Sequence, residues 1–203
     1  MTVSETCRRL ELIASCQGVA YDTPRALGFS ESIMSWNIDK SRSNLEFAVK
    51  HMVISTVRGV FSDYDAEILL DDSQLEQASV VARVRTASVS TKDATRDEYL
   101  VSPEFFDPQT FPEMLFRSTG VRVRGKRITL IGDLTIRDCT RSITLSGNWN
   151  SQGGGMNCRL QFSFSGEIER EAFGLVFNSA VETVSVVVGK KIKLNVEILL
   201  VES

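Results

Sequence analysis

An alternation of apolar and polar residues with a period of two is the feature that most restricts how this chain can fold. One phase of the alternation holds Leu45, Phe47, Val49 and His51, and the residues between them hold the other. Successive side chains of a β-strand point to opposite faces, so the first set can line an interior. The single histidine of the chain, His51, therefore falls on the predicted inner face among apolar neighbours.

The same alternation returns in a series of short segments separated by turn-rich stretches. In the clearest of them, residues 156–170, Phe162 and Phe164 lie in the apolar phase. Regularly spaced short strands with one polar face indicate antiparallel sheets in a barrel or a sandwich. Closure removes exposed strand edges, so we predict an all-β fold built as an antiparallel barrel. The segments that follow the opening strand are 57–70, 78–90, 114–125, 127–138, 141–150, 156–170 and 191–201.

Two stretches depart from the strand pattern. Residues 91–101 interleave acidic and basic residues as a short surface helix does, and the three prolines in 102–113 indicate a compact loop. Loops on a rigid scaffold often hold function, which makes this excursion a candidate lid. Residues 1–34 are predicted to form an extension with a helix near its start, and the barrel is predicted to occupy 35–203.

Composition limits the classes of partner. The formal net charge of -3 gives no electrostatic reason to expect nucleic acid. No apolar run is long enough for an integral membrane segment, and charged residues interrupt any signal-peptide core, so we expect a cytoplasmic protein. The four cysteines lack zinc or C-x-x-C spacing and are expected to be reduced, with a bridge left open. We expect neither a metal nor a cofactor.

Three polar residues are candidate contacts of a ligand. His51 has no nucleophile signature beside it and acts as a general base, as a partner of a ligand head group, or as a buried structural histidine. Arg96 either anchors its helix or binds a head group at the end of the barrel. Arg170 follows Ile168 in the inward phase, and an unpaired buried charge is costly. It is therefore expected either to pair with a carboxylate or to meet a ligand oxygen.

Phenylalanines form the largest group of apolar candidates. They fill a dry core, as in small barrels packed solid with side chains, or they line a cavity for an apolar ligand. The predicted apolar contacts of a ligand are Phe47, Val49, Phe61, Phe105, Phe116, Phe162, Phe164 and Phe173.

Short motifs occur in a consistent order from about residue 35 to 203. They are W-N-I-D-K-S-R-S at 36–43, F-A-V-K-H-M at 47–52, V-R-G-V-F at 57–61, S-V-S-T at 88–91, R-D-E-Y-L at 96–100, S-P-E-F-F-D at 102–107, F-P-E-M-L-F-R-S-T at 111–119, G-D-L-T-I-R at 132–137 and R-E-A-F-G at 170–174. This series resembles the YceI-like family of polyisoprenoid-binding, lipocalin-like proteins. The chain departs from the family in the turn after Arg137, where Asp138 to Arg141 replace a Gly and Thr-Lys turn.

The resemblance implies an eight-stranded antiparallel barrel that holds a long amphiphilic chain, often an isoprenoid, without catalysis. It also implies that a homodimer is common among relatives. Our first hypothesis is therefore a lipid-binding module for an isoprenoid, a quinone or a similar amphiphile. The second is an enzyme that uses the same cavity with His51 as general base. The third is an interaction protein with a packed core that works through its outer face or its N-terminal helix.

Overall fold

The structure is a computed structural model that describes residues 36–51, 55–70, 74–153, 158–176 and 188–202. Within these ranges there is one α-helix, α1 (Ala94–Leu100). The strands are β1 (Trp36–Ile38), β2 (Asn44–His51), β3 (Ser55–Phe61), β4 (Tyr64–Leu69), β5 (Ser79–Arg85), β6 (Val89–Ser90), β7 (Glu113–Arg124), β8 (Arg127–Ile136), β9 (Cys139–Gln152), β10 (Arg159–Glu169) and β11 (Val188–Glu202). The short 3-10 turns are η1 (Lys40–Arg42), η2 (Leu75–Gln77), η3 (Thr86–Ser88) and η4 (Arg170–Phe173).

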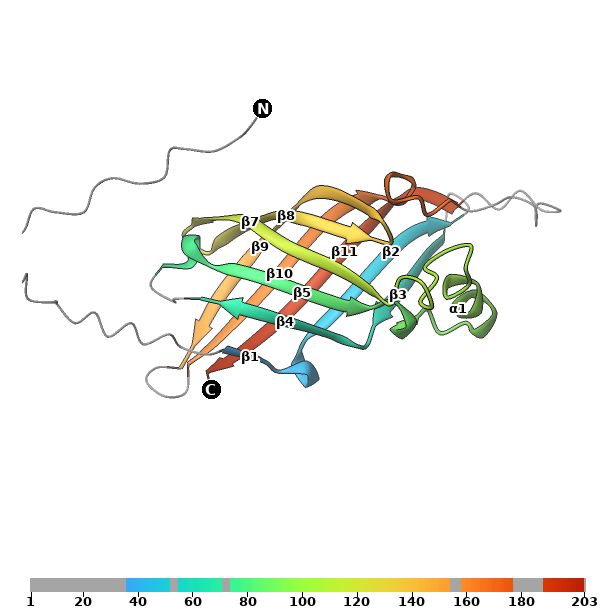
Figure 1. The fold of residues 1–203 in the computed structure, drawn as a ribbon. Coiled ribbons are helices and arrows are strands. Elements are labelled where there is room, and N and C mark those ends of the chain that lie inside the picture. The colour runs from blue at the N-terminus through green and yellow to red at the C-terminus, as the bar shows by residue number, and fades with distance from the viewer. Residues whose placement is uncertain (1–35, 52–54, 71–73, 154–157, 177–187, 203) are drawn as a thin grey trace, which may run out of the picture. The chain divides into compact units, whose positions relative to one another are not determined.

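The antiparallel sheet curls until it meets itself (Figure 1). Strands pair in the order β4-β5-β7-β8-β9-β10-β11-β2-β3-β6. Only Ser62 and Asp63 separate β3 from β4, so the two ends of this order belong to one bent stretch of chain. Backbone hydrogen bonds continue across the bend, from Ser62 N to Ser88 O (3.3 Å) and from Arg85 N to Asp63 O (2.9 Å). The pairing thus closes into a barrel.

The eleven described strands correspond to eight longer ones. β1 and β2 both pair with β11, through Trp36↔Glu202 and Asn44↔Glu197, so they form one strand interrupted by η1. β3 with β4, and β5 with β6, form two more interrupted strands. The predicted eight-stranded antiparallel barrel with a short helix is therefore confirmed. The N-terminal helix and the division at residue 34 stay predictions, because residues 1–35 lie outside the described ranges.

The helical excursion is attached to the barrel by local hydrogen bonds. Asp93 caps α1 by accepting from Arg96 N at 3.1 Å, as a good N-cap residue does. The compact loop after the helix returns beneath Thr86, which is fully buried and donates its hydroxyl to Phe111 O at 2.8 Å. The predicted helix and loop are thus both present, and both lie at one end of the barrel (Figure 1).

Two clusters of buried side chains occupy opposite ends of the barrel. We call the end that carries α1 the helix end, and the end where β7 turns into β8 the hairpin end (Figure 1). The hairpin-end cluster contains Trp36, Leu75, Val121, Ile128, Leu130, Leu145, Leu160, Phe162 and Leu200. The helix-end cluster contains Phe61, Val89, Phe105, Phe106, Met114, Ile136, Ile168, Phe173 and Leu175.

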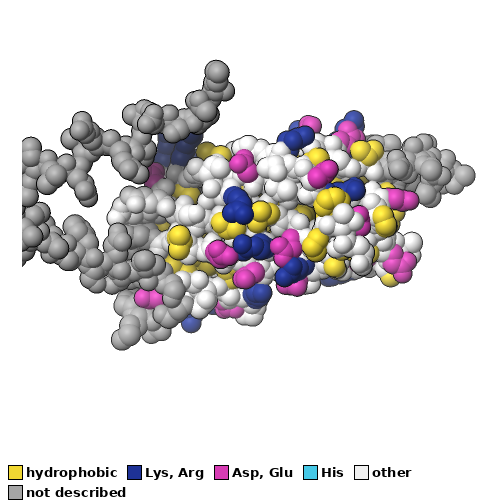
Figure 2. Space-filling model, viewed as in Figure 1, with side chains coloured by type: hydrophobic (Ala, Val, Ile, Leu, Met, Phe, Trp, Pro, Cys, Tyr) yellow, Lys and Arg dark blue, Asp and Glu magenta, His cyan; other side chains and the backbone are white. Residues whose placement is uncertain are grey.

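The outer face carries interleaved charges. Figure 2 shows basic and acidic side chains side by side over the middle of the barrel. Two cross-strand ion pairs are Arg83 with Glu67 (2.8 Å) and Arg58 with Glu46 (2.7 Å). Exposed pairs of this kind contribute about 0–1 kcal/mol each, so the barrel depends on its interior for stability.

Candidate ligand-binding cavity

A cavity of about 860 Å³ lies inside the barrel. This volume falls within the range of small-molecule sites, about 300–1,000 Å³. Its lining runs from Leu75 and Leu200 at the hairpin end to Arg96 at the helix end, and most of it consists of aliphatic and aromatic side chains. The interior is therefore hollow and apolar rather than packed solid.

Ten of the eleven predicted contact residues line this cavity. They are Phe47, Val49, His51, Phe61, Arg96, Phe105, Phe116, Phe162, Phe164 and Arg170. Phe173 differs, because it is 1% exposed within the helix-end cluster and is absent from the lining. The period-two phase placed the strand residues on the inner face, whereas Phe173 lies in η4, where that phase does not apply. Contact of any of these residues with a ligand stays a prediction.

Aliphatic residues make up much of the wall, and the emphasis on phenylalanine missed them. Ile192, Leu194 and Val196 line the cavity from β11. Each falls in the apolar phase of its strand, so the alternation already marked them. They would have been found by counting every inward residue rather than the aromatic ones.

Several lining residues whose side chains can form hydrogen bonds lie at the helix end. His51 ends β2, Arg96 lies on α1, and Arg170 begins η4. Thr91 and Tyr99 join them in the lining. The cavity therefore has a polar end and an apolar end, which suits a molecule with a polar head and an apolar tail.

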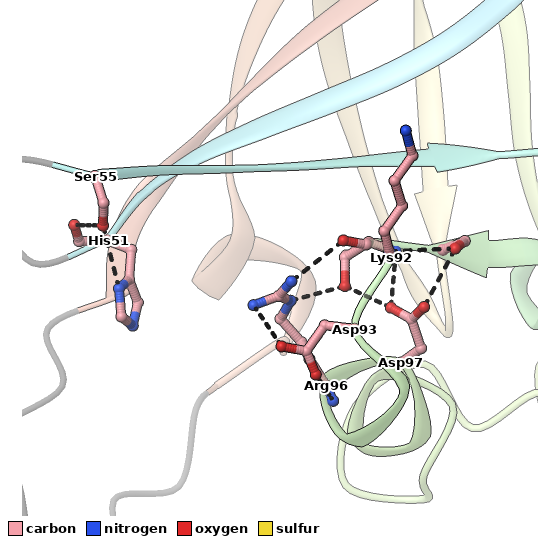
Figure 3. A network of polar contacts seen from close by, with 8 residues as sticks. His51, Ser55, Lys92, Asp93, Arg96 and Asp97 are labelled. Atoms are coloured by element: carbon pink, nitrogen blue, oxygen red, sulfur yellow. Dashed lines mark hydrogen bonds and ion pairs between the residues drawn. The ribbon is translucent and has the colours of Figure 1, made fainter.

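Arg96 reaches from the helix to the segment just before it (Figure 3). Its Nε donates to Thr91 Oγ1 at 2.7 Å, and its Nη2 donates to Thr91 O at 3.2 Å. Nη1 lies 3.5 Å from Asp93 Oδ2. These contacts favour the anchoring role, although the same side chain also borders the cavity.

Asp97, which lies beside Arg96 in Figure 3, also binds Thr91. Its Oδ1 accepts from Thr91 N (2.7 Å) and from Thr91 Oγ1 (2.5 Å), and its Oδ2 accepts from Ser90 Oγ (3.2 Å). Burial alone would raise the pKa of the Asp97 carboxyl, but the hydrogen bonds from Thr91 and Ser90, with nearby Arg96, hold that pKa below its ordinary value. The charged carboxylate thus fastens α1 to the barrel.

His51 has one described side-chain partner, Ser55 (Figure 3). The Nδ1 atom lies 3.4 Å from Ser55 Oγ, and the same hydroxyl donates to His51 O at 2.6 Å. Because a hydroxyl has one hydrogen, this donation leaves Ser55 Oγ as an acceptor toward the imidazole. A nucleophilic serine needs the opposite polarity, with its proton directed at the histidine.

Arg170 is buried and binds backbone carbonyls. Nη1 donates to Leu175 O at 2.6 Å and Nε donates to Gly189 O at 3.1 Å, while Glu171 Oε1 lies farther off at 3.8 Å. The ion pair with Glu171 is the carboxylate contact expected from the sequence, but the closest contacts are backbone carbonyls. Contact with a ligand oxygen stays a prediction. Leu175 is five residues away and Gly189 is 19 residues away, and the residue pattern does not reveal which carbonyls meet the guanidinium. Arg170 joins η4 to the start of β11.

No group of three or more His, Cys, Asp or Glu side chains comes together as a metal site within the described residues. Cys139 and Cys158 are free thiols, and Cys7 and Cys16 lie outside the described ranges. In the same part of the chain, no helix has the length and apolar character needed to cross a membrane.

Comparison with known proteins identifies what this barrel resembles. The YceI-like domain family matches residues 36–200. UPF0312 proteins of Staphylococcus aureus (strain N315) and Staphylococcus epidermidis (strain ATCC 12228 / FDA PCI 1200) are 30% and 31% identical over 162 and 161 residues. Each alignment covers 78% of this chain and 92% of the relative.

Solved structures show the same architecture. A YceI protein of Campylobacter jejuni is 28% identical with a TM-score of 0.65, over 76% of this chain and 90% of that one. BcnA of Burkholderia cenocepacia is 20% identical with a TM-score of 0.69, over 80% and 99%. A polyisoprenoid binding domain from Saccharophagus degradans is 14% identical with a TM-score of 0.63, over 84% and 99%.

Proposed function

This chain belongs to the YceI-like family, and from that premise we propose that it binds a long-chain amphiphile inside its barrel without catalysing a reaction. The observation that carries the proposal is the apolar cavity of about 860 Å³ with polar groups at one end. An isoprenoid or quinone has this same division between tail and head. A cytoplasmic location and a homodimer are further expectations of the sequence, and the proposal depends on neither.

The energetics of tail burial are sufficient for such binding. Each methylene removed from water contributes about 0.8 kcal/mol, so a dozen carbons contribute about 10 kcal/mol before the costs of ordering. Leu194, Val196 and Phe164 supply wall for this burial in the middle of the barrel. Because hydrophobic burial has no direction, we expect the wall to select by length and width more than by chemical detail.

The head group is expected at the helix end. His51 and Arg96 both border the cavity there, and each carries nitrogen atoms that can hydrogen-bond to a hydroxyl or carbonyl oxygen. The domain from Saccharophagus degradans is described as binding polyisoprenoids, but at 14% identity it shares only the fold with this chain. The proposal therefore depends on the cavity of this chain and on its family.

Two observations support binding over catalysis. The described partner of His51 is a serine whose proton is directed at a carbonyl, and Arg170 is occupied by backbone oxygens. General acid–base chemistry needs a titratable group within reach of the reacting atom and free to exchange a proton. Among the described residues of the helix end, Arg96, Asp97 and Arg170 are each held by hydrogen bonds to the protein.

Native mass spectrometry of the purified full chain, followed by organic extraction and lipid analysis, tests the proposal. We expect a discrete adduct with the mass of an isoprenoid, a quinone or another amphiphile. Protein stripped of lipid should regain an adduct on incubation with polyprenol. A bare mass that does not shift with polyprenol or with quinone would overturn the proposal and favour an interaction protein.

A further inference from the structure

Gly59 leaves a space in the inner wall that the ring of Phe47 occupies. The two residues face each other in the β2–β3 ladder. A Cβ atom built on Gly59 would lie 2.3 Å from Phe47 Cζ, 2.6 Å from Phe47 Cε1 and 3.0 Å from Thr91 Cγ2. Gly59 does not have a positive φ, so its backbone does not require glycine. Glycine is needed at this position because any side chain would occupy the space of the Phe47 ring.

Of the two side chains beside Gly59, Thr91 is the one that cannot yield. Arg96 donates to its hydroxyl and its carbonyl, and Asp97 accepts from its amide and its hydroxyl. These four hydrogen bonds hold Thr91 in place, and two of them involve a charged carboxylate, which strengthens them. A methyl group at position 59 would therefore act on Phe47.

The Phe47 ring lies between Phe61 and the cavity. Its ring centroid lies 5.6 Å from that of Phe61, which blocks movement along the wall. Phe47 points into the barrel yet is only half-buried, because part of its ring borders the cavity. A ring pushed away from Gly59 would turn into the cavity and narrow it.

We infer that Gly59 sets the width of the cavity at the helix end by letting Phe47 lie against the wall. The recess admits a chain with methyl branches, such as an isoprenoid, where a narrower passage would admit only a straight chain. Gly59 is thus a positioning residue that acts through Phe47. This inference rests on the proposed function, because it names the class of tail that the cavity takes.

Gly132, another glycine of the inner wall, cannot set the cavity width in the same way. A Cβ on Gly132 would meet the Phe116 ring at 2.4 Å, but it would also meet the backbone oxygen of Arg117 at 2.5 Å. A side chain there would displace the sheet itself. At Gly59, the three nearest atoms all belong to side chains, so the barrel can keep its fold while the ring moves.

The test compares two alcohols of equal carbon number, the branched geranylgeraniol and the straight eicosanol. In Gly59→Ala we expect the affinity for geranylgeraniol to fall about tenfold, the effect of about one methyl group of lost room, and the affinity for eicosanol to change less than about threefold. Gly120→Ala is the matched control, because a Cβ there meets no atom within 4 Å. It should leave both affinities unchanged.

The double variant Phe47→Leu/Gly59→Ala tests the coupling. A smaller side chain at position 47 leaves room for the new methyl group, so we expect the preference for geranylgeraniol to return. Equal losses for both alcohols, or no rescue by Phe47→Leu, would overturn the inference. Thermal unfolding of each variant separates a change in binding from a change in stability.

A crystal structure of Gly59→Ala tests the role of Gly59 separately from the proposed binding of lipid. We expect the Phe47 ring to be turned into the cavity while β2 and β3 keep their register. A ring still against the wall would overturn the inference even if the wild-type protein binds lipid. If the wild-type protein binds neither alcohol nor polyprenol, the proposed function and the selectivity both fail, although a displaced ring would still confirm the geometry.

Discussion

Both ends of the barrel are packed with apolar side chains, but only the helix end adds a network of polar contacts among the described residues. At the hairpin end, Leu160 and Leu200 are 1% and 2% exposed, and Trp36 lies over them with its Nε1 donating to Leu70 O at 3.2 Å. At the helix end, a network around Thr91 fastens α1 through polar contacts. Apolar packing responds little to pH, whereas the hydrogen bonds that the Asp97 carboxylate accepts depend on its negative charge.

This difference assigns a role to each end. A tail inserted toward the hairpin end meets only apolar wall, while a head group meets hydrogen-bonding residues at the helix end. The helix end also carries α1 and the compact loop that follows it. We therefore expect exchange of ligand to involve the helix end, and four predictions test this contrast.

The largest effect is expected where the cavity wall is apolar. Phe164→Arg places a cation on the inner face of β10, where it forces water or a counterion into the tail site, and we expect ligand retention to be lost. The matched control is Ser163→Arg, which adds the same charge on the exposed outer face of the same strand. Native mass spectrometry should show an adduct in the control alone. Retention of lipid by Phe164→Arg would place the tail elsewhere.

A core truncation at the hairpin end should lower global stability. Leu160→Ala removes a side chain that is 1% exposed, and we expect the free energy of unfolding to fall by about 2–5 kcal/mol. Its exposed neighbour Gln161→Ala should change that free energy by less than about 0.5 kcal/mol. Urea unfolding followed by circular dichroism gives both values. A loss below about 1 kcal/mol would contradict tight packing at this end.

Acid should loosen the helix end first. The pKa of Asp97 is lowered in the folded protein, so its contribution to stability is present above the unfolded pKa and is lost as pH falls through the folded value. Below about pH 4 we expect hydrogen-exchange protection of α1 to fall while protection of the β7–β8 hairpin persists. Asp97→Asn should remove this difference in pH response, and Glu98→Gln on the same helix should retain it. Equal loosening of both ends would refute the contrast.

The smallest effect is expected at His51. In a binding protein, His51→Ala removes at most one hydrogen bond to a head group, so the affinity for polyprenol should fall by about fivefold or less, about 1 kcal/mol. No turnover should be present to lose. A reaction of the bound lipid that disappears in this variant would instead establish the enzyme hypothesis.

The local residue pattern of the sequence predicted the strands and the helix. The period-two alternation identified the strands, and the change of pattern after Ser90 identified α1. The inner phase also placed Phe47 and Phe164 in the cavity wall. These features could be predicted because each depends on neighbours within a few residues.

Contacts between distant segments could not be predicted in this way. Arg170 donates to the carbonyl of Gly189, 19 residues further along the chain, and no residue type marks a carbonyl. The significance of Gly59 was equally hidden, because it depends on the ring of a neighbouring strand. From sequence alone, a glycine within a strand indicates only a locally less stable strand. Its role becomes clear once the residue opposite it in the neighbouring strand is known.

Closure of the barrel through β2 and β11 has a consequence for biosynthesis. The Asn195 amide donates to Glu46 across a separation of 149 residues, and the last strand pairs with one of the first. Contacts so distant in sequence form slowly, and a ribosome adds about 5–20 residues per second. The early strands must therefore wait, for about 7 to 30 seconds, with an unpaired edge until β11 emerges. Nascent chains of this protein are consequently candidates for chaperone protection during translation, and loss of the C-terminal strand would leave two edges open to aggregation.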